Sequence, residues 1–354
     1  MTAPYYSDDF VTLYQGRCED ILPTLSLSGS VHLITDPPYF KVKADAWDNQ
    51  WKKSSEFLQW MGEWLRLAKP LLSADASVWV FASPKLTSAV ESVVAAEFRV
   101  LNSVRWVKSG GDNLKRVSLP AMRSMVSIWE GIIFAEQFGQ IKSGYESASE
   151  GVWRDVFTPI REYLAAQRDL YGVTNRQVDA ALGTAGMAGH YFSASQWALP
   201  TAEAWAKICT LIPFDREYED LRREYEDLRR PYNVNQRDLS TDVWTTFPSV
   251  SHYPGKHPCE KPAGLLAHII ETTTRPGDTI IDCFAGSGAV LDVARQLGRK
   301  AVGIEMDAKW CEHARTRLSA PTLQITPRAH PRVAELRSSG WSGSELPFEM
   351  DAVA

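Results

Sequence analysis

Apolar and amphipathic segments alternate over the first 135 residues. Continuous apolar runs predict strands at residues 31–35, 77–82, 101–107 and 126–135. Apolar side chains at helical spacing predict helices at residues 56–68 and 85–97. This alternation is typical of an α/β domain with a largely parallel sheet.

A second region, residues 279–318, repeats the alternation in compact form. Strands are predicted at 279–283 and 300–305, with a helix at 289–297 between them and a helix at 306–318 after them. One strand-helix-strand unit cannot cover both faces of its own sheet. We therefore expect this region to complete the sheet that the first region begins.

Residues 136–250 lack this rhythm and predict a mostly helical insertion. A helix over residues 161–170 is broken at Gly172, and Thr174 can cap a second helix that Gly183 ends. Helix, tight turn and helix is similar to a module that reads DNA bases. A small helical bundle has the same pattern, and the charges of this segment cancel, so both interpretations stay open.

A tandem repeat follows, in which Arg-Glu-Tyr-Glu-Asp-Leu-Arg occurs at residues 216–222 and again at 223–229. The apolar members of the repeat share one helical stripe, formed by Tyr218, Leu221, Tyr225 and Leu228. Two heptads are too few for a stable coiled coil. A charged helix that packs one face on a neighbour is therefore favoured over a dimerisation device.

The composition is that of an ordinary globular protein of 354 residues, 44% hydrophobic and 23% charged, with a formal net charge of −5. No apolar run approaches the roughly 18 residues that span a bilayer. The start is acidic where a signal peptide would be basic, so a cytoplasmic protein without membrane contact is expected. Five scattered cysteines argue against zinc and disulfides, and no metal is expected. Residues 319–354 are polar and proline-rich, which predicts a loosely ordered tail.

Local charge departs from the acidic mean between residues 99 and 123, where six basic residues stand against one acid. Phosphate recognition normally shows itself as such positive charge. Four members of the strip are candidate DNA contacts, namely Lys108, Lys115, Arg116 and Arg123. A solvated surface without a partner is the alternative that charge alone leaves open.

The residues Asp36-Pro37-Pro38-Tyr39 follow the first predicted strand and suit chemistry on an exocyclic amino group. The lone pair of such a nitrogen is delocalised into the ring, and acceptors for its hydrogens favour a geometry that aims the lone pair at a methyl donor. Asp36 offers a carboxylate, and Pro37 a carbonyl on a restricted backbone. Tyr39 offers a flat face for a base that has left the duplex. In isolation, the same residues are equally a turn after a strand.

Residues 282–288, Asp-Cys-Phe-Ala-Gly-Ser-Gly, join a predicted strand to a predicted helix, as nucleotide-binding loops do. Glu305 ends the next strand, 19 residues after Gly286. Folds that bind dinucleotides place an acid on ribose hydroxyls at about this interval. Leu291 stands where a third glycine would belong, and a Walker A motif is absent, which disfavours ATP chemistry.

Together, the tetrad and the loop resemble those of the β-class amino-group DNA methyltransferases, in which the tetrad precedes the cofactor loop. His257-Pro258-Cys259-Glu260-Lys261-Pro262 and Gly303-Ile304-Glu305-Met306-Asp307 are similar to two further motifs of that class.

The resemblance implies a Rossmann-like fold that depends on S-adenosyl-L-methionine. It implies a catalytic half at residues 1–135, a target-recognition insertion at 136–250 and a cofactor half at 251–318.

The same resemblance assigns roles to residues. The implied catalytic residues are Asp36, Pro37, Pro38 and Tyr39, and the implied cofactor contacts are Asp282, Phe284, Ala285, Gly286, Ser287, Gly288, Glu305 and Lys261. His257 is interpreted as part of a structural turn. Trp47 and Trp51 are candidates for the base pocket or for core packing.

One departure concerns the adenine of the cofactor. Family members usually carry Gly-Asp-Cys before the tetrad, whereas this chain has Gly16-Arg17-Cys18, and Arg17 cannot accept a hydrogen bond. Asp20 is a candidate substitute, and apolar contact with the adenine is the alternative.

Aspartate at the first tetrad position is, by resemblance, the commoner choice for adenine N6, and serine for cytosine N4. Site-specific N6-adenine methylation with base flipping is therefore predicted, with N4-cytosine methylation as the alternative. A DNA-binding regulator with a vestigial methyltransferase core is the alternative of another class. Double-stranded DNA is the expected partner, and the family suggests a homodimer. Any restriction endonuclease of a restriction-modification pair would be a separate chain, because no nuclease-like motif cluster is evident.

Overall fold

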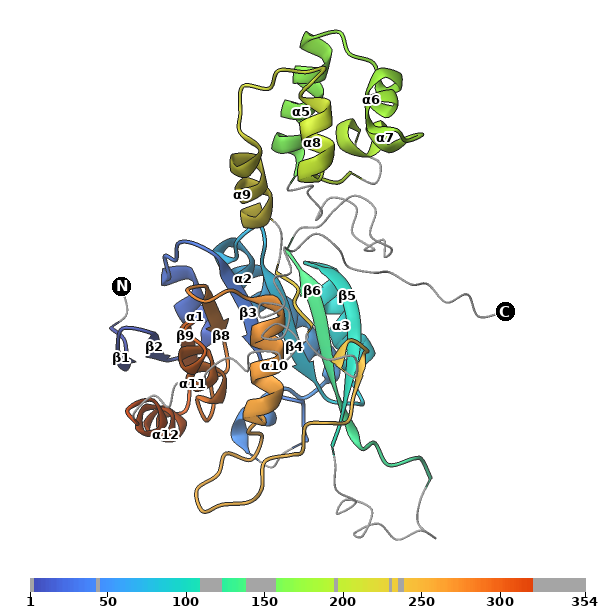
Figure 1. The fold of residues 1–354 in the computed structure, drawn as a ribbon. Helices are drawn as coiled ribbons and strands as arrows, with labels where there is room; N and C mark the ends of the chain where they lie inside the picture. Colours follow the sequence, from blue (N-terminus) through green and yellow to red (C-terminus); the bar gives the residue numbers. More distant parts are fainter. Residues whose placement is uncertain are drawn as a thin grey trace, which may run out of the picture.

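The computed structural model describes residues 3–42, 45–108, 123–137, 157–193, 197–228, 231–234 and 239–320. These residues form one sheet of nine strands with helices on both faces, and a further group of helices stands apart from the sheet (Figure 1). The strands are β1 (Tyr6–Ser7), β2 (Val11–Gln15), β3 (Val31–Thr35), β4 (Ser77–Ala82), β5 (Arg99–Val107), β6 (Trp129–Glu136), β7 (Val243–Trp244), β8 (Thr279–Asp282) and β9 (Lys300–Glu305). The helices around the sheet are α1 (Cys18–Ile21), α2 (Ser54–Ala68), α3 (Thr87–Ala95), α10 (Ala263–Thr273), α11 (Ala289–Gln296) and α12 (Ala308–Leu318).

The strand order is β1-β2-β9-β8-β3-β4-β6-β5-β7. Strands β2, β9, β8, β3 and β4 run parallel, which confirms the prediction of a largely parallel sheet. Strand β8 lies between β9 and β3, so the second sequence region completes the sheet of the first, as expected. β6 lies between β4 and β5 and is antiparallel to both.

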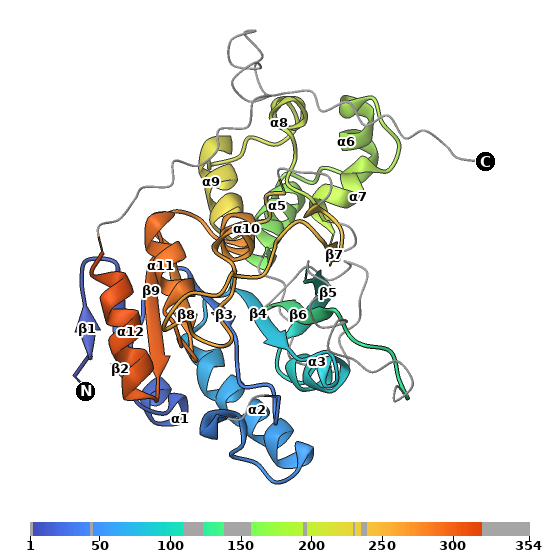
Figure 2. The same ribbon diagram turned by 90° about the horizontal axis from the view of Figure 1, so that it is seen from below.

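Helices lie on both faces of the sheet (Figure 2), and an apolar layer packs them against each face. On one face, α1, α2 and α3 bury side chains such as Trp64 and Leu65. On the other face, α10, α11 and α12 bury side chains such as Ile269, Leu291 and Cys311. Helix α10 was not predicted from the sequence. Most of its positions are apolar, which blurs the helical periodicity that marks a surface helix.

The predicted elements of both regions are present, with ends that differ by a few residues. Strands β1, β2 and β7 were not predicted. β7 lies inside the predicted insertion, residues 136–250, yet it pairs in parallel with β5 and buries Trp244 in the core of the sheet. The chain therefore returns to the sheet before the predicted end of the insertion.

The separate helices are α5 (Thr158–Leu170), α6 (Asn175–Leu182), α7 (Met187–Phe192), α8 (Ala202–Ile208) and α9 (Tyr218–Leu228). They share a core of their own, in which Ile160, Val178 and Ile208 are completely buried. The predicted caps are present, because the Thr174 hydroxyl accepts from the Gln177 amide at 3.3 Å and Gly183 ends α6 in the left-handed region, at φ 73°.

Helix α9 carries the tandem repeat. Leu221 is completely buried in the core of the helical group, and Tyr218, Tyr225 and Leu228 pack against the same core. The prediction of a helix that packs one apolar face on its neighbours is confirmed.

The N-terminal hairpin of β1 and β2 lies beside α12. The Tyr5 hydroxyl donates to Glu312 Oε2 at 3.0 Å, and the Tyr6 hydroxyl lies 3.3 Å from the Leu318 carbonyl oxygen. The first and last parts of the described sheet domain are therefore neighbours. Within the described ranges, no helix is long and apolar enough to cross a membrane. The predicted tail lies outside the described residues from residue 321 onward.

Candidate functional site

The candidate site lies where neighbouring parallel strands end. β3 ends at Thr35, directly before Asp36, and β8 ends at Asp282. β9 ends at Glu305, and β2 ends at Gln15, directly before the Gly16-Arg17-Cys18 segment. Because the carboxyl ends of parallel strands meet at one edge of a sheet, motifs far apart in the sequence meet here.

A cavity of about 970 Å³, including its open mouth, fills this edge. The lining includes the tetrad, residues 16–19, Trp47, Trp60, His257, residues 259–261, residues 282–287, residues 304–306 and Trp310. Tetrad and cofactor loop thus share one cavity.

Asp36 presents its two carboxylate oxygens differently. Oδ2 accepts a hydrogen bond from the Lys261 ammonium group. Oδ1 is buried and has no hydrogen-bond partner among the residues that the structure describes. Burial raises the pKa of Asp36, and the neighbouring Lys261 charge opposes this rise. Burying an acceptor without a hydrogen-bond donor costs free energy. Oδ1 can therefore accept a hydrogen bond from a donor group on a ligand.

Lys261 was predicted to support the cofactor; it lines the cavity together with the cofactor loop, and its ammonium group bonds to Asp36 of the tetrad. Burial opposes its charge, but Asp36 and Glu130 outweigh burial and raise the pKa of Lys261. The ammonium lies 5.1 Å from the centre of the Tyr39 ring and 4.9 Å from that of Phe81. Lys261 is thus a buried cation that pairs with Asp36 of the tetrad.

Tyr39 is held at both ends. Its hydroxyl donates to Glu130 Oε2 at 3.1 Å, and its backbone amide donates to Asp48 Oδ1 at 2.7 Å. Asp48 also accepts from the Val42 amide, which fixes the turn after the tetrad. Glu130 was missed in the sequence, although an acid inside the apolar run of β6 was a usable signal.

Asp282, at the start of the cofactor loop, is joined to the tetrad strand by Thr35. The Thr35 hydroxyl donates to Asp282 Oδ1 at 2.8 Å and accepts from the Cys283 amide at 3.1 Å. Asp282 also accepts from the Phe284 amide. Burial raises the pKa of Asp282 to about 7. Thr35 was likewise not singled out in the sequence.

Glu305 connects the two segments that bear cofactor motifs. Oε2 accepts from the Gly286 amide and Oε1 from the Asp307 amide, both at 2.8 Å. Burial raises the pKa of this carboxyl group. Each oxygen keeps lone-pair capacity, so hydroxyl groups of a ligand can still donate to it.

The two glycines of the loop serve different purposes. Gly286 lines the cavity at φ 49°, where a Cβ atom would stand 3.2 Å from the His257 ring. Gly288 lies at φ 73°, where a Cβ atom would stand 2.9 Å from that of Ala314. Gly288, predicted as a cofactor contact, is not among the described lining residues. It allows α11 to approach α12.

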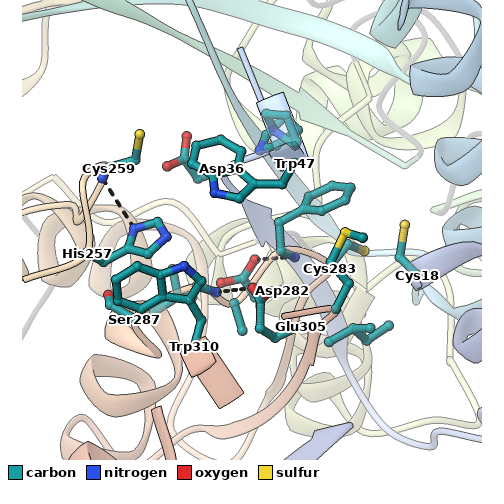
Figure 3. A pocket seen from close by; sticks show the side chains of 18 of the residues that line it. Cys18, Asp36, Trp47, His257, Cys259, Asp282, Cys283, Ser287, Glu305 and Trp310 are labelled. Carbon is teal, nitrogen blue, oxygen red and sulfur yellow. Dashed lines mark hydrogen bonds between the residues drawn. The ribbon is translucent and has the colours of Figure 1, made fainter. Parts of the chain in front are cut away.

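Three aromatic side chains, Trp47, His257 and Trp310, also line the cavity (Figure 3). The His257 ring is stacked with Trp47, with centres 6.1 Å apart, and meets Trp310 edge-on at 4.4 Å. His257 Nδ1 accepts from the Cys259 amide at 3.3 Å, as expected of a structural turn. Trp47, in a short 3-10 helix (Ala46–Asp48), lines the cavity, whereas Trp51 packs on Trp60.

Beside Arg17, the cavity is lined by an acid that the sequence analysis did not single out, Glu19. Both side chains line the cavity, and Glu19 Oε1 accepts from Arg17 at 2.7 Å and from the Trp60 indole at 2.5 Å. Asp20 is exposed and is not among the described lining residues. The prediction for Asp20 is therefore corrected: α1 turns Glu19, and not Asp20, toward the cavity.

The basic strip is not a continuous cationic surface. Arg99 is buried and pairs with Glu136 at 3.2 Å, and Arg105 stacks on Trp129. Lys108 pairs with Glu130, so the prediction of a free phosphate contact is revised for this residue. Arg123 is exposed shortly before β6. The other two candidates, Lys115 and Arg116, lie outside the described residues.

Fold and site together define a class of protein. A glycine loop and an acid end adjacent parallel strands, as in nucleotide-binding folds, and beside them a buried carboxylate and a tyrosine face the same cavity. This arrangement is that of a Rossmann-like fold in which a nucleotide-type cofactor and a second ligand can meet in one cavity.

The family follows from comparison with known proteins. The model of the N6/N4 DNA methylase family matches residues 31–316, and the chain belongs to this family. It is 25% identical over 339 residues to the type II methyltransferase M2.DpnII of Streptococcus pneumoniae, covering 90% of this chain and 94% of the relative. It is 23% identical over 338 residues to M2.LlaDCHI of Lactococcus lactis subsp. cremoris, with coverages of 90% and 93%.

A solved structure supports the fold. The PvuII DNA methyltransferase, described as cytosine-N4-specific, superposes with a TM-score of 0.52 at 13% identity, covering 95% of this chain and 94% of the other. The Rossmann-like methyltransferase fold and the amino-group DNA methyltransferase family predicted from the motifs are both confirmed. The protein is a DNA methyltransferase of the N6/N4 class.

Proposed function

We propose that this chain transfers a methyl group from S-adenosyl-L-methionine to N6 of adenine in duplex DNA, at a specific sequence. The observation that carries the proposal is Asp36 Oδ1, a buried acceptor with no partner among the described residues, in the cavity that also contains the cofactor loop. An exocyclic amino group offers two hydrogens, one for Asp36 Oδ1 and one for the Pro37 carbonyl.

The residues of the cofactor half fit S-adenosyl-L-methionine, which supplies an electrophilic methyl group when bound. The backbone from Phe284 to Ser287 lines the cavity and would hold the amino-acid portion close to the tetrad. Glu305 would accept from the ribose hydroxyls. Glu19, with Arg17 and Trp60, would face the adenine.

The tetrad residues act on the base. Tyr39, with its hydroxyl anchored on Glu130, presents a ring on which a flipped base can stack. Asp36 and Pro37 accept the amino hydrogens and turn the nitrogen lone pair out of conjugation. Once the nitrogen is alkylated, its proton becomes acidic and can pass to Asp36 without a separate base.

Adenine is favoured over cytosine because aspartate opens the tetrad, and the same two acceptors would also serve the amino group of cytosine. The helices α5 to α9 are proposed to recognise the target sequence, since their core is independent of the cofactor cavity. Arg123, which is exposed and precedes β6, is a candidate phosphate contact.

The test is methyl transfer from labelled cofactor to duplex DNA, with digestion of the product to nucleosides. Wild type is expected to form N6-methyladenine, and Asp36→Ala is expected to lose about 10²- to 10³-fold in rate, as when one oriented polar group is removed from an active site. Binding of S-adenosylhomocysteine should persist in the variant. Equal incorporation by both proteins would refute the proposal, and N4-methylcytosine would change the assigned base.

A further inference from the structure

A buried chain of charges extends from the tetrad to the surface. Asp36 is bonded to Lys261, and the Lys261 ammonium also lies 3.5 Å from Glu130 Oε2. The other Glu130 oxygen accepts from Lys108, and Tyr39 donates to Oε2. The four charged side chains come from four segments: the ends of β3 and β5, the start of β6, and the residues before α10.

The charges of these four side chains balance. Two carboxylates alternate with two ammonium groups, which satisfies the requirement that buried charges be paired. Side-chain exposure rises from 5% at Lys261 and 10% at Glu130 to 35% at Lys108. Burial raises the pKa of Glu130, but Lys261 and Lys108 outweigh it and lower the pKa. Glu130 is therefore an ionised group inside the protein.

A second buried acid on β6 shows what a merely structural pair looks like. Glu136 lies at the far end of the same strand and pairs with Arg99, with side-chain exposures of 7% and 6%. Glu130 has the same burial but a different setting, because its oxygens hold the hydroxyl of Tyr39 and the ammonium of Lys261. Both partners contact the substrate side of the site.

We propose that Glu130, clamped by Lys108, is a positioning residue for methyl transfer. It anchors the Tyr39 ring and draws Lys261 away from Asp36 Oδ1, so that this oxygen stays available to the amino group of the target base. The inference deepens the proposed function and rests on it.

Removing the charge of Glu130 changes both contacts. Lys261 would keep only Asp36 as a charged partner and could bridge both of its oxygens, which would occupy the acceptor that the substrate needs. The Tyr39 hydroxyl would lose its charged acceptor, and the ring would gain freedom. Methyl transfer should suffer while the cofactor loop, which Glu130 does not touch, stays intact.

The test compares Glu130→Gln with Glu136→Gln, which removes an equally buried charge from the same strand. Glu130→Gln is expected to lower the single-turnover rate roughly 10- to 100-fold, as loss of a supporting partner does, and Glu136→Gln to leave it near wild type. S-adenosylhomocysteine affinity should be the same in all three proteins. Fluorescence of 2-aminopurine at the target position should show weaker quenching in Glu130→Gln, because the flipped base stacks less well on Tyr39.

The pH profile gives a readout that a structural role would not move. The groups facing Asp36 are Lys261, Glu130, Tyr39 and Asp282. Burial raises the pKa of Asp36, and Glu130 raises it further, whereas Lys261 lowers it. Loss of the Glu130 charge should therefore lower the pKa of Asp36 and move the acidic limb of the kcat profile to lower pH. The maximal kcat at the plateau should be reduced as well.

Lys108→Met provides a second variant if Glu130→Gln does not fold. If Lys108 acts by holding Glu130, Lys108→Met should lower the methyl-transfer rate and leave the salt dependence of DNA binding unchanged. If Lys108 contacts a phosphate, the variant should instead reduce the slope of the salt dependence by about one unit. An active wild type with Glu130→Gln indistinguishable from Glu136→Gln would overturn the inference and leave the proposed function standing. A wild type without methyl transfer would refute the function itself.

Discussion

At the scale of single residues, Asp282 links the stability of the fold to pH. Burial raises the pKa of its carboxyl group to about 7, compared with about 3.9 for an unfolded chain. The folded protein therefore binds this proton more tightly than the unfolded chain does. Between about pH 4 and pH 7, the unfolded state holds fewer protons, so this group lowers stability as pH rises.

The substitution Asp282→Asn isolates this effect. Asparagine keeps an oxygen that accepts from Thr35 and Phe284 but does not titrate. Without cofactor, the melting temperature of wild type is expected to fall relative to that of the variant from about pH 4 to about pH 7, and to run parallel above that. Thermal melts across this range measure it, and a difference independent of pH would contradict it.

The sequence was sufficient to predict site residues that belong to a short, continuous motif. Asp36 and Glu305 each belong to a motif of a few consecutive residues at the end of one strand. Glu130 and Thr35 were missed because their partners lie on segments far away in the sequence, and these segments meet only through a strand order that no single segment contains. For Asp20 the prediction differs from the structure by one position: Glu19, and not Asp20, lines the cavity, since on a helix the neighbouring residue points about 100° away.

At the scale of elements, the tandem repeat on α9 offers an internal comparison. Leu221 and Leu228 occupy the same place in identical heptads, yet Leu221 is completely buried and Leu228 only partly. The helical core meets the first heptad more closely than the second.

Leu221→Ala is expected to destabilise the helical group by about 2–5 kcal/mol, because it leaves a cavity in a closed core. Leu228→Ala should cost clearly less, since water and neighbouring side chains can fill the space. Urea unfolding followed by hydrogen exchange in α5 to α9 measures both. Equal losses for the two variants would show that the heptads are equivalent in energy.

The elements themselves were predicted where periodicity was strong. α2 and β4 stand close to their predicted bounds. β1 and β7 have two residues each, too short to show an alternating pattern. The antiparallel direction of β6 was also beyond the sequence, because an apolar run does not state which way it runs relative to its neighbours.

At the scale of the whole molecule, the catalytic cavity and the helical group have separate cores. Every described residue that lines the cavity belongs to the sheet domain or its connecting loops. Replacing residues 157–228 by a flexible linker should therefore leave S-adenosylhomocysteine affinity close to wild type and abolish sequence-selective DNA binding. Calorimetry and gel-shift assays with specific and random duplexes measure the two properties. Retained selectivity would place recognition elsewhere.

The contact of the N-terminal hairpin with α12 bears on the order in which the elements follow one another along the chain. Since Tyr5 and Tyr6 reach Glu312 and Leu318, a short peptide could join residue 320 to residue 3 and turn the sheet domain into a closed ring. Such a ring, reopened among the separate helices, would present the cofactor loop before the tetrad. The adjacent strands β9, β8 and β3 would be unchanged. Circular permutation would thus reverse the order of the two motifs in the sequence without changing the edge of the sheet at which they meet.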